Sequence, residues 1–331
     1  MKIITQSPRG FRASIREFIR LIGLLQLFFT VREALLATGR YLALLPVVAL
    51  TKITNFYIEA MWRINPNNKL LKDYLPMMIA KSKRSVVHTI NGKKHSFVLH
   101  TPNSVCSYRA DSFSTKEPET LEWIDQFGNG GVLFDIGANV GLYSVYHAVT
   151  QGGTVYAFEP LVFNLPCLVR NINSNNLQSK IKLISNPLSS QCGFADFKLS
   201  KDVDGGAFCG FGVDYGHDGE PLKNANISYT TYGFSLDYMY STGVIKDKPT
   251  LIKIDVDGIE HLILEGGKNL LSDPACRSVL VEINENFSMQ VNKVRDILIS
   301  CGFTFKYKKR ADEFNSQGVD QGTYNQIWVK L

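Results

Sequence analysis

The stretch "VLFDIGANVGLYS", residues 132–144, decides the fold of this chain. It opens with an apolar run typical of a buried strand and closes with one typical of a helix. Between them, Gly137, Asn139 and Gly141 form a loop whose glycines let the backbone approach a ligand closely. Asp135 stands near the strand end, so the sequence predicts a ligand-binding strand–loop–helix unit with a carboxylate beside it.

The next predicted strand, in "TVYAFEP" at residues 154–160, ends with Glu159, 18 residues after Gly141. A dinucleotide would need the pattern GxGxxG, but the middle glycine is missing, and Asp135 would repel a pyrophosphate. S-adenosylmethionine carries a sulfonium and an ammonium, which a carboxylate attracts. An acid in the position of Glu159 commonly accepts hydrogen bonds from ribose hydroxyls. The two motifs therefore favour S-adenosylmethionine over NAD as the cofactor.

Apolar strands alternate with helices from about residue 85 onward, which predicts an α/β fold whose parallel sheet has helices on both faces. Only a loop joins the last two strands, so we expect them to pair antiparallel. The predicted strands are Val132–Ile136, Thr154–Phe158, Ile181–Ser185, Leu251–Asp255, Ser278–Ile283, Phe303–Lys308 and Gln326–Val329. The predicted helices are Pro118–Phe127, Gly141–Thr150, Leu161–Asn173, Ile259–Leu271 and Val291–Cys301, and residues 85–99 are predicted to form a hairpin.

One long segment, Ser200–Tyr232, interrupts this alternation. It is rich in Gly, Asp and Asn, yet it also carries Phe211, Tyr215 and Tyr229, and disordered segments rarely contain so many aromatic residues. A loop of this length inside a compact domain is usually functional. We expect this segment to be a loop that covers the substrate.

Composition and charge limit the classes of function. The 331 residues are 45% apolar and 20% charged, which is typical of a folded globular protein. Residues 1–63 hold nine Lys/Arg and three Asp/Glu, which equals the whole net charge of +6, so residues 64–331, the predicted main domain, are neutral. A neutral body argues against a nucleic-acid groove. Six cysteines without a CxxC pair indicate free thiols in a reducing compartment, so we expect a cytoplasmic protein.

The first sixty-three residues are predicted to form a helical extension. Arg9, Arg12, Arg16 and Arg20 recur on one helix face, and Leu and Phe fill the other faces through residues 9–31. This pattern suits attachment to an anionic membrane surface, and it equally suits packing against the main domain or a partner. The sequence shows neither a signal peptide nor an uninterrupted apolar run of about 18 residues, so it does not predict a membrane-spanning helix.

Taken together, the motifs resemble the FkbM-type methyltransferases, a family of class I S-adenosylmethionine-dependent enzymes. They stand in the family's order and cover about residues 85–310. The matching segments are "KEPETLEWI" (116–124), "FDIGANVGLYS" (134–144), "AFEP" (157–160), "SLD" (235–237), "IKIDVDGIEHLILEGG" (252–267) and "LVEIN" (280–284).

The resemblance implies a Rossmann-like, seven-stranded sheet that is mostly parallel, with an antiparallel last strand. It also implies methyl transfer from S-adenosylmethionine, usually to a hydroxyl of a glycan or similar polar metabolite. Carried over by position, the cofactor-binding residues are Asp135, Gly137, Asn139, Gly141, Glu159 and Asn186. The first four would line the methionine part, Glu159 would bind the ribose and Asn186 the adenine.

The fourth and fifth strands of the sheet end in candidates for catalysis, because open α/β sheets bind ligands at their carboxyl ends. An alcohol acceptor needs a general base within hydrogen-bond reach. The candidates are Asp255, Asp257, Glu282 and His261, and we expect Asp255 to contact the cofactor as well. Asp257 stands where the family usually has Glu. Asp257 and Glu260 also fit a capping box at the start of the next helix, which is the structural alternative for both residues.

Two further questions concern charge at this edge of the sheet. A lysine within a buried strand needs a carboxylate partner, and Asp135 or Glu282 could serve Lys253. A metal-assisted reaction would need two or three of Asp255, Asp257 and Glu282 around one Mg²⁺, an ion that prefers oxygen ligands. Neighbours on a strand point to opposite sides, which disfavours such a ligand set, and we expect no metal.

A second class of function remains open at this point. The chain could be a membrane-associated binding module, built on a methyltransferase scaffold that has lost its chemistry. Such a module would bind S-adenosylmethionine without transferring a methyl group. The intact cofactor motifs favour the enzyme.

Overall fold

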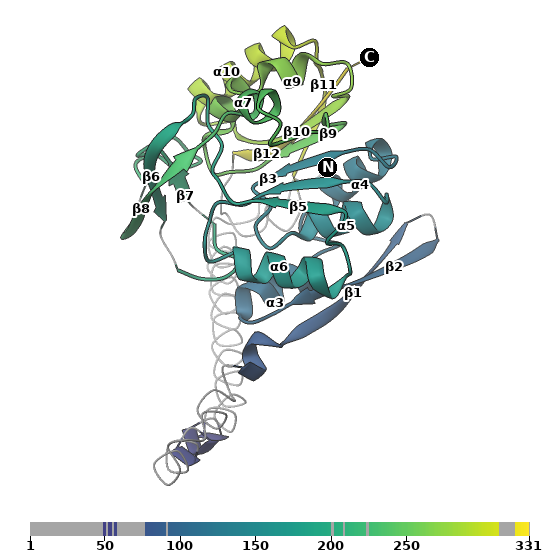
Figure 1. Ribbon diagram of the computed structural model, residues 1–331, viewed down its shortest axis with the longest axis vertical. Coiled ribbons are helices and arrows are strands. Elements are labelled where there is room, and N and C mark those ends of the chain that lie inside the picture. Colours follow the sequence, from purple (N-terminus) through teal and green to yellow (C-terminus); the bar gives the residue numbers. More distant parts are fainter. Residues whose placement is uncertain are drawn as a thin grey trace, which may run out of the picture. The chain divides into compact units, whose positions relative to one another are not determined.

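Figure 1 shows the computed structural model of the chain. It describes residues 77–90, 92–199, 202–207, 209–222, 225–310 and 322–330, with a few positions between 49 and 57. The chain separates into two units, Met1–Pro76 and Met77–Leu331. The predicted amphipathic helix at residues 9–31 and the predicted domain boundary after residue 63 lie outside the described residues, so both stay predictions.

A seven-stranded sheet forms the centre of the second unit, in the order β11-β12-β10-β9-β3-β4-β5. Its strands are β3 (Leu133–Ile136), β4 (Val155–Phe158), β5 (Ile181–Ile184), β9 (Leu251–Ile254), β10 (Ser278–Asn284), β11 (Thr304–Lys309) and β12 (Thr323–Val329). Six strands run parallel, and β12 lies antiparallel between β10 and β11. The predicted fold class is therefore confirmed, including the direction of the last strand.

The two faces of this sheet bury separate cores, because side chains alternate along each strand. The helices are α3 (Ser104–Asp111), α4 (Pro118–Phe127), α5 (Leu142–Thr150), α6 (Leu165–Ser174), α7 (Leu236–Ser241), α8 (Glu260–Glu265), α9 (Lys268–Ser272) and α10 (Ser288–Ser300). On β9, Ile252 and Ile254 join the core of α7 to α10, whereas Leu251 joins the core of α4 to α6. Figure 1 shows these two groups of helices on opposite sides of the sheet.

A hairpin of β1 (Lys83–Ile90) and β2 (Lys93–His100) packs against α5 and α6. It confirms the hairpin predicted for residues 85–99. Phe97 and Leu99 alternate with exposed or half-buried residues on β2, so one side of the hairpin extends the core while the other faces water.

The segment predicted to be a covering loop is partly a sheet, so that prediction was wrong in part. The strands β6 (Gly193–Leu199), β7 (Cys209–Phe211) and β8 (Ile227–Gly233) form an antiparallel sheet in the order β7-β6-β8. The signal for β8 was present, because Ile227, Tyr229 and Thr231 alternate with more exposed residues at the period of a strand. Its pairing partner β6 lies before the glycine-rich segment. A pattern within the segment alone therefore could not reveal the sheet.

The single helix predicted over Ile259–Leu271 is divided into α8 and α9 by Gly266 and Gly267. Glycine is a poor helix former. A Cβ atom at Gly266 would lie 2.3 Å from the carbonyl oxygen of Ser189, so the close packing at this point also requires a glycine. Among the described residues, no helix has both the length and the apolar character needed to cross a membrane.

Candidate active site

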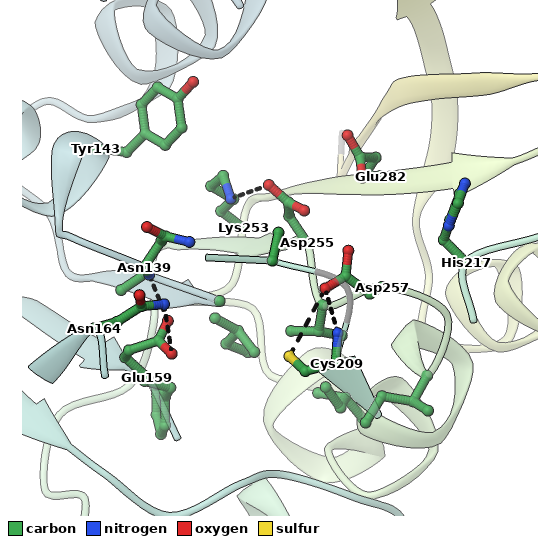
Figure 2. A pocket seen from close by; sticks show the side chains of 18 of the residues that line it. Asn139, Tyr143, Glu159, Asn164, Cys209, His217, Lys253, Asp255, Asp257 and Glu282 are labelled. Carbon is green, nitrogen blue, oxygen red and sulfur yellow. Dashed lines mark hydrogen bonds and ion pairs between the residues drawn. The ribbon is translucent and has the colours of Figure 1, made fainter. Parts of the chain in front are cut away.

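A cavity of about 310 Å³ opens at the carboxyl ends of β3, β4, β9 and β10. Figure 2 shows Glu159 on one side of it, and on the other side a group of three carboxylates, Asp255, Asp257 and Glu282. The sheet brings these residues together because parallel strands end at the same edge. Residues predicted from the sequence therefore line two different walls of one cavity, and one of these walls carries three carboxylates.

The first wall is the loop after β3, and its shape depends on Gly137. This residue has a φ of +79°, and a Cβ atom there would lie 1.9 Å from the carbonyl oxygen of Asp255. Only glycine fits, because the loop crosses directly over the end of β9. Asn139 adopts a φ of +52° and donates from its side-chain amide to the carbonyl oxygen of Gly206, 2.7 Å away. The backbone of this loop therefore borders the cavity directly.

Glu159 follows β4 and lines the same wall. Its carboxylate accepts hydrogen bonds from the backbone N–H of Asn139 at 2.6 Å and of Leu161 at 2.9 Å, and from the Asn164 amide at 3.2 Å. Burial raises the pKa of Glu159 to about 7, against the effect of these three donors. One acceptor position on its Oε2 atom is left for a donor in the cavity.

Two residues predicted to line the methionine part of the cofactor do not reach the cavity. Asp135 is fully buried beneath α5, where it accepts a hydrogen bond of 2.5 Å from the Ser144 hydroxyl, and burial raises its pKa. Gly141 has a φ of +83° at the start of α5 and packs against Leu168. Side chains alternate along β3, so Asp135 points toward α5. Asp135 and Gly141 therefore support the loop on the side away from the cavity.

The second wall contains a buried ion pair that the sequence had left open. The Lys253 ammonium lies 2.9 Å from the Asp255 carboxylate, and the lysine side chain is 1% exposed. Its direct partner is thus Asp255, whereas the sequence had suggested Asp135 or Glu282. Burial would lower the pKa of Lys253, but the carboxylates of Asp255, Asp135 and Glu117 raise it above the ordinary value. The ammonium is therefore charged and forms an ion pair with the Asp255 carboxylate.

Asp257 fixes the segment that covers the cavity. Its carboxylate accepts a hydrogen bond of 3.2 Å from the backbone N–H of Cys209, and its own φ is +62°. The helix that follows begins after Ile259, whose side chain makes no capping bond, so the predicted capping box led by Asp257 is wrong. Glu260 does bond to backbone N–H groups, those of Val256 and Gly258, as the structural alternative expected. Burial raises its pKa to about 8.

Glu282 differs from the other two carboxylates of this wall. Within the part of the chain that the structure describes, its carboxyl group has no hydrogen bond and no ion pair, whereas Asp255 and Asp257 each have a donor (Figure 2). Desolvation raises its pKa well above the ordinary value, and the nearby carboxylates of Asp255 and Glu117 raise it further. A carboxyl group in this setting takes up a proton more readily than an exposed one.

Two other predicted residues have different fates. Asn186 lines the cavity, and its side-chain amide donates to the carbonyl oxygen of Tyr232 at 3.1 Å. His261 is buried in α8, away from the cavity, with its ring edge-on to Phe287 at 6.4 Å. Burial lowers the pKa of His261 to about 4. His261 is thus a neutral packing residue and cannot reach an acceptor in the cavity.

The geometry does not support a set of ligands for a magnesium ion. No group of three His, Cys, Asp or Glu side chains converges in a way that could hold a metal ion anywhere in the described ranges. Asp255 is engaged with Lys253, and Asp257 with the backbone of Cys209. These contacts turn the carboxylates to different partners instead of a common centre.

The sequence profile described as "Methyltransferase FkbM domain" matches residues 135–305, which is more than half of the chain. The chain belongs to the FkbM methyltransferase domain family. The family supports S-adenosyl-L-methionine-dependent methyl transfer, which the resemblance in the motifs implied. No curated protein sequence matches this chain.

Two of the solved structures that this chain resembles are a methyltransferase and a fibrillarin. The FkbM methyltransferase from Methylobacillus flagellatus KT is 13% identical with a TM-score of 0.42, and the alignment covers 79% of this chain and 60% of that one. A fibrillarin from Aeropyrum pernix, in complex with natively bound S-adenosyl-L-methionine, is 11% identical with a TM-score of 0.41, covering 76% and 86%. This chain therefore spans 60% of the length of the first.

The first wall of the cavity fits S-adenosyl-L-methionine. The absent side chain at Gly137 leaves the backbone open to the cavity, and the free acceptor position of Glu159 suits a ribose hydroxyl. Phe158 and Leu188 give the same side an apolar surface for a flat ring. The cofactor supplies a methyl group on a positively charged sulfur, which the carboxylates of the opposite wall attract. We expect Gly137, Asn139 and Glu159 to hold it.

Several residues of the FkbM methyltransferase cavity were missed from the sequence. Glu117, at the start of α4, pairs with Lys116 and accepts a hydrogen bond of 2.7 Å from the Tyr143 hydroxyl. Despite its burial, Lys116 and Lys253 lower the pKa of Glu117 to about 2. His217 enters the cavity from the segment after β7. The only signal for Glu117 in the sequence was its place in the motif at 116–124, because Tyr143 and Lys253 come from distant elements.

Proposed function

We propose that the enzyme methylates a hydroxyl group of a glycan or a similar polar metabolite, with Glu282 as the general base. The observation that carries the proposal is the Glu282 carboxyl, which lines the cavity without a donor while its two neighbours are engaged. A hydroxyl is a weak nucleophile at neutral pH, so a base that takes its proton increases the rate.

The two neighbouring carboxylates, Asp255 and Asp257, are already engaged with other groups of the protein. The Asp255 carboxylate accepts a hydrogen bond from the Lys253 ammonium, so it is already engaged with a cation. Asp257 holds the backbone of Cys209, so a change in its charge would loosen the covering segment. In the proposed step, the acceptor oxygen bonds to the methyl carbon while its proton passes to Glu282. The bond from that carbon to the sulfur breaks, and the sulfur keeps the electron pair.

The composition of the cavity supports a hydroxyl-bearing acceptor. The side near Glu282 includes Thr323, Tyr324 and Asn325 of β12, all of which can hydrogen-bond to hydroxyl groups. The Asn325 amide donates to Glu119 at 2.8 Å, which fixes the orientation of the Asn325 side chain. A polyhydroxylated acceptor would exchange hydrogen bonds with this surface, whereas an apolar one would leave its groups unpaired.

The test compares Glu282→Gln with wild type, using labelled S-adenosylmethionine and fractionated glycans or lipids of the source cell. We expect the turnover rate to fall by about 10²- to 10⁴-fold because the amide cannot take a proton. The cofactor dissociation constant, measured by calorimetry, should stay within about threefold, since Glu282 lies on the other wall. Glu285→Gln is the matched control, because Glu285 follows the same strand and pairs with Lys308 outside the cavity.

Full activity in Glu282→Gln would exclude Glu282 as the base. If wild type binds the cofactor but transfers no methyl group to any fraction, the inactive binding module would replace the enzyme as the better proposal. Mass spectrometry of the labelled product would identify the methylated atom, and a methylated nitrogen or carbon would contradict the hydroxyl acceptor.

Attachment to a membrane is a separate proposal, and it rests on the arginine pattern at residues 9–31. Deleting residues 1–60 should abolish sedimentation with anionic liposomes, because the basic residues and the apolar faces would both be lost. Unchanged sedimentation after the deletion would show that the proposal is wrong. Neutral liposomes are the control for electrostatic attraction.

A further inference from the structure

A row of aromatic rings runs along the outer face of the small sheet. Phe194 on β6 lies 5.0 Å from Tyr232 on β8, edge-on, and Tyr232 lies 5.0 Å from Phe234. Phe234 in turn stacks on Tyr238 of α7 at 6.0 Å and an interplanar angle of 18°. We call these four rings the aromatic row. Their contacts with one another hold each ring in a fixed orientation.

The aromatic row is exposed to a degree that core packing does not explain. Phe194 is 76% exposed and Tyr238 is 47% exposed, although both are large and mostly apolar. The opposite face of the same sheet already buries its own rings, and Phe197 stacks there on Tyr229 at 5.3 Å. Phe197 also lines the cavity. A sheet with one buried and one aromatic exposed face indicates a binding surface on the exposed side.

The charges beside the aromatic row indicate an uncharged partner. Phe194 pairs with Tyr232 in the sheet register, and the next outward pairs are Asp196 with Thr230 and Lys198 with Ser228. Asp196 accepts a hydrogen bond of 2.8 Å from the Thr230 hydroxyl, and Lys198 forms an ion pair with Asp214. Because the lysine is already paired, the face offers little to a phosphate backbone, whose binding depends on cations. Hydroxyl and carboxylate groups beside flat rings suit a polyhydroxylated ligand with apolar C–H faces.

The aromatic row is joined to the active site by a short backbone connection. Asn186, Pro187 and Leu188 line the cavity. The N–H of Phe234 donates to the Pro187 carbonyl at 3.0 Å, and the Asn186 side chain donates to the Tyr232 carbonyl. Asn186 and Pro187 thus form part of the cavity wall and also hydrogen-bond to the backbone of Tyr232 and Phe234 in the row. In Figure 1 the strands β6 and β8 project from the rest of the fold next to the carboxyl ends of the parallel strands.

We propose that the aromatic row is a second glycan-binding site, which binds uncharged sugar residues of a polymeric acceptor by stacking them on Phe194, Tyr232 and Tyr238. It would hold the polymer beside the cavity and raise the local concentration of its methylatable unit. The inference rests on the proposed glycan acceptor for its biological meaning. The binding itself requires neither the cofactor nor the base.

The test measures binding of cellohexaose, maltohexaose and mannohexaose to the full chain by saturation-transfer NMR and calorimetry, without S-adenosylmethionine. We expect wild type to bind at least one of them. Phe194→Ala and Tyr232→Ala should each weaken this binding by about threefold to tenfold, the usual contribution of one ring contact. Tyr108→Ala is the matched control, because Tyr108 is 52% exposed on α3, does not line the cavity, and lies outside the aromatic row.

The proposal is overturned if wild type binds none of the three sugars, or if the Phe194 and Tyr232 variants bind as well as the Tyr108 variant. It is also overturned if the variants instead change the molar mass measured by light scattering, which would make the row a contact between two copies of the chain. Loss of sugar binding with normal methylation of a short acceptor would support this site. Failure of Glu282→Gln to reduce turnover would refute only the proposed base.

Discussion

The two walls of the cavity are built in different ways. We call the first wall, with Gly137 and Glu159, the cofactor wall, and the second wall, with Lys253 and Glu282, the reaction wall. On the cofactor wall, a glycine loop places backbone groups against the cavity, and Glu159 is held by N–H donors that lie within 20 residues of it. On the opposite wall, Lys253, Asp255 and Asp257 lie on or just after β9, whereas Glu282 comes from β10. Asp257 bonds to the backbone of Cys209, a residue 48 positions away. Local chain geometry therefore makes the cofactor wall, whereas the wall where we place the reaction also needs Glu282 of a second strand and the distant contact of Asp257.

The strongest test of this comparison is Gly137→Ala. Its Cβ would meet the Asp255 carbonyl at 1.9 Å in a left-handed conformation, so we expect a loss of roughly 3–6 kcal/mol in the free energy of unfolding. Cofactor binding should disappear in calorimetry. Gly152→Ala is the control: Gly152 has a φ of +68° but no atom within 4 Å, so it should lose only about 1–2 kcal/mol. Equal losses in urea unfolding would show that the clash is unimportant.

Lys253→Met tests the reaction wall. It leaves Asp255 and the buried Asp135 without their cation, so we expect a loss of about 3–5 kcal/mol in unfolding free energy. The matched control is Lys182→Met, since the ion pair of Lys182 with Asp247 is largely exposed and should contribute about 0–1 kcal/mol. If the two variants lose the same stability in urea, the buried pair has no special role.

The pH dependence of cofactor binding tests the cofactor wall. The pKa of Glu159 is raised to about 7, so the carboxylate that would accept a ribose hydroxyl is lost as the pH falls below 7. Between pH 7 and pH 5 we expect the affinity for S-adenosylmethionine to fall, by up to about tenfold for each pH unit. Glu159→Gln should bind more weakly than wild type at pH 8 and should lose this pH dependence. An unchanged profile in that variant would place the titration elsewhere.

The smallest effect on stability and turnover is expected for His261→Phe. His261 does not line the cavity. The neutral imidazole is buried against Phe287, and its Nδ1 atom has no hydrogen-bond partner in the described structure. Replacing it with an apolar ring should change the unfolding free energy by less than about 1.5 kcal/mol and turnover by less than about twofold. A hundredfold loss of turnover with normal stability would restore His261 as a catalytic candidate.

Much of the fold could be predicted because its signals are local. Each buried strand is a short apolar run, and α4 begins at Pro118 as predicted. The small sheet was missed because β7 has only three residues and pairs with β6 across a glycine-rich segment. The predicted helix over Ile259–Leu271 was divided because Gly266 lies against the backbone of Ser189, a contact that no neighbouring residue reveals.

The sequence by itself determined the fold class, the family and the cofactor, and it placed Gly137, Asn139 and Glu159 on the cofactor wall. A strand end, its loop and the next strand end are close in sequence, so their chemistry can be read in order. Only the tertiary structure decided that Asp255 pairs with Lys253 and that Glu282 faces the cavity without a donor. The proton affinity of Glu282 and its access to an acceptor depend on burial and on charges from other strands. The order of residues in the sequence does not reveal either of them.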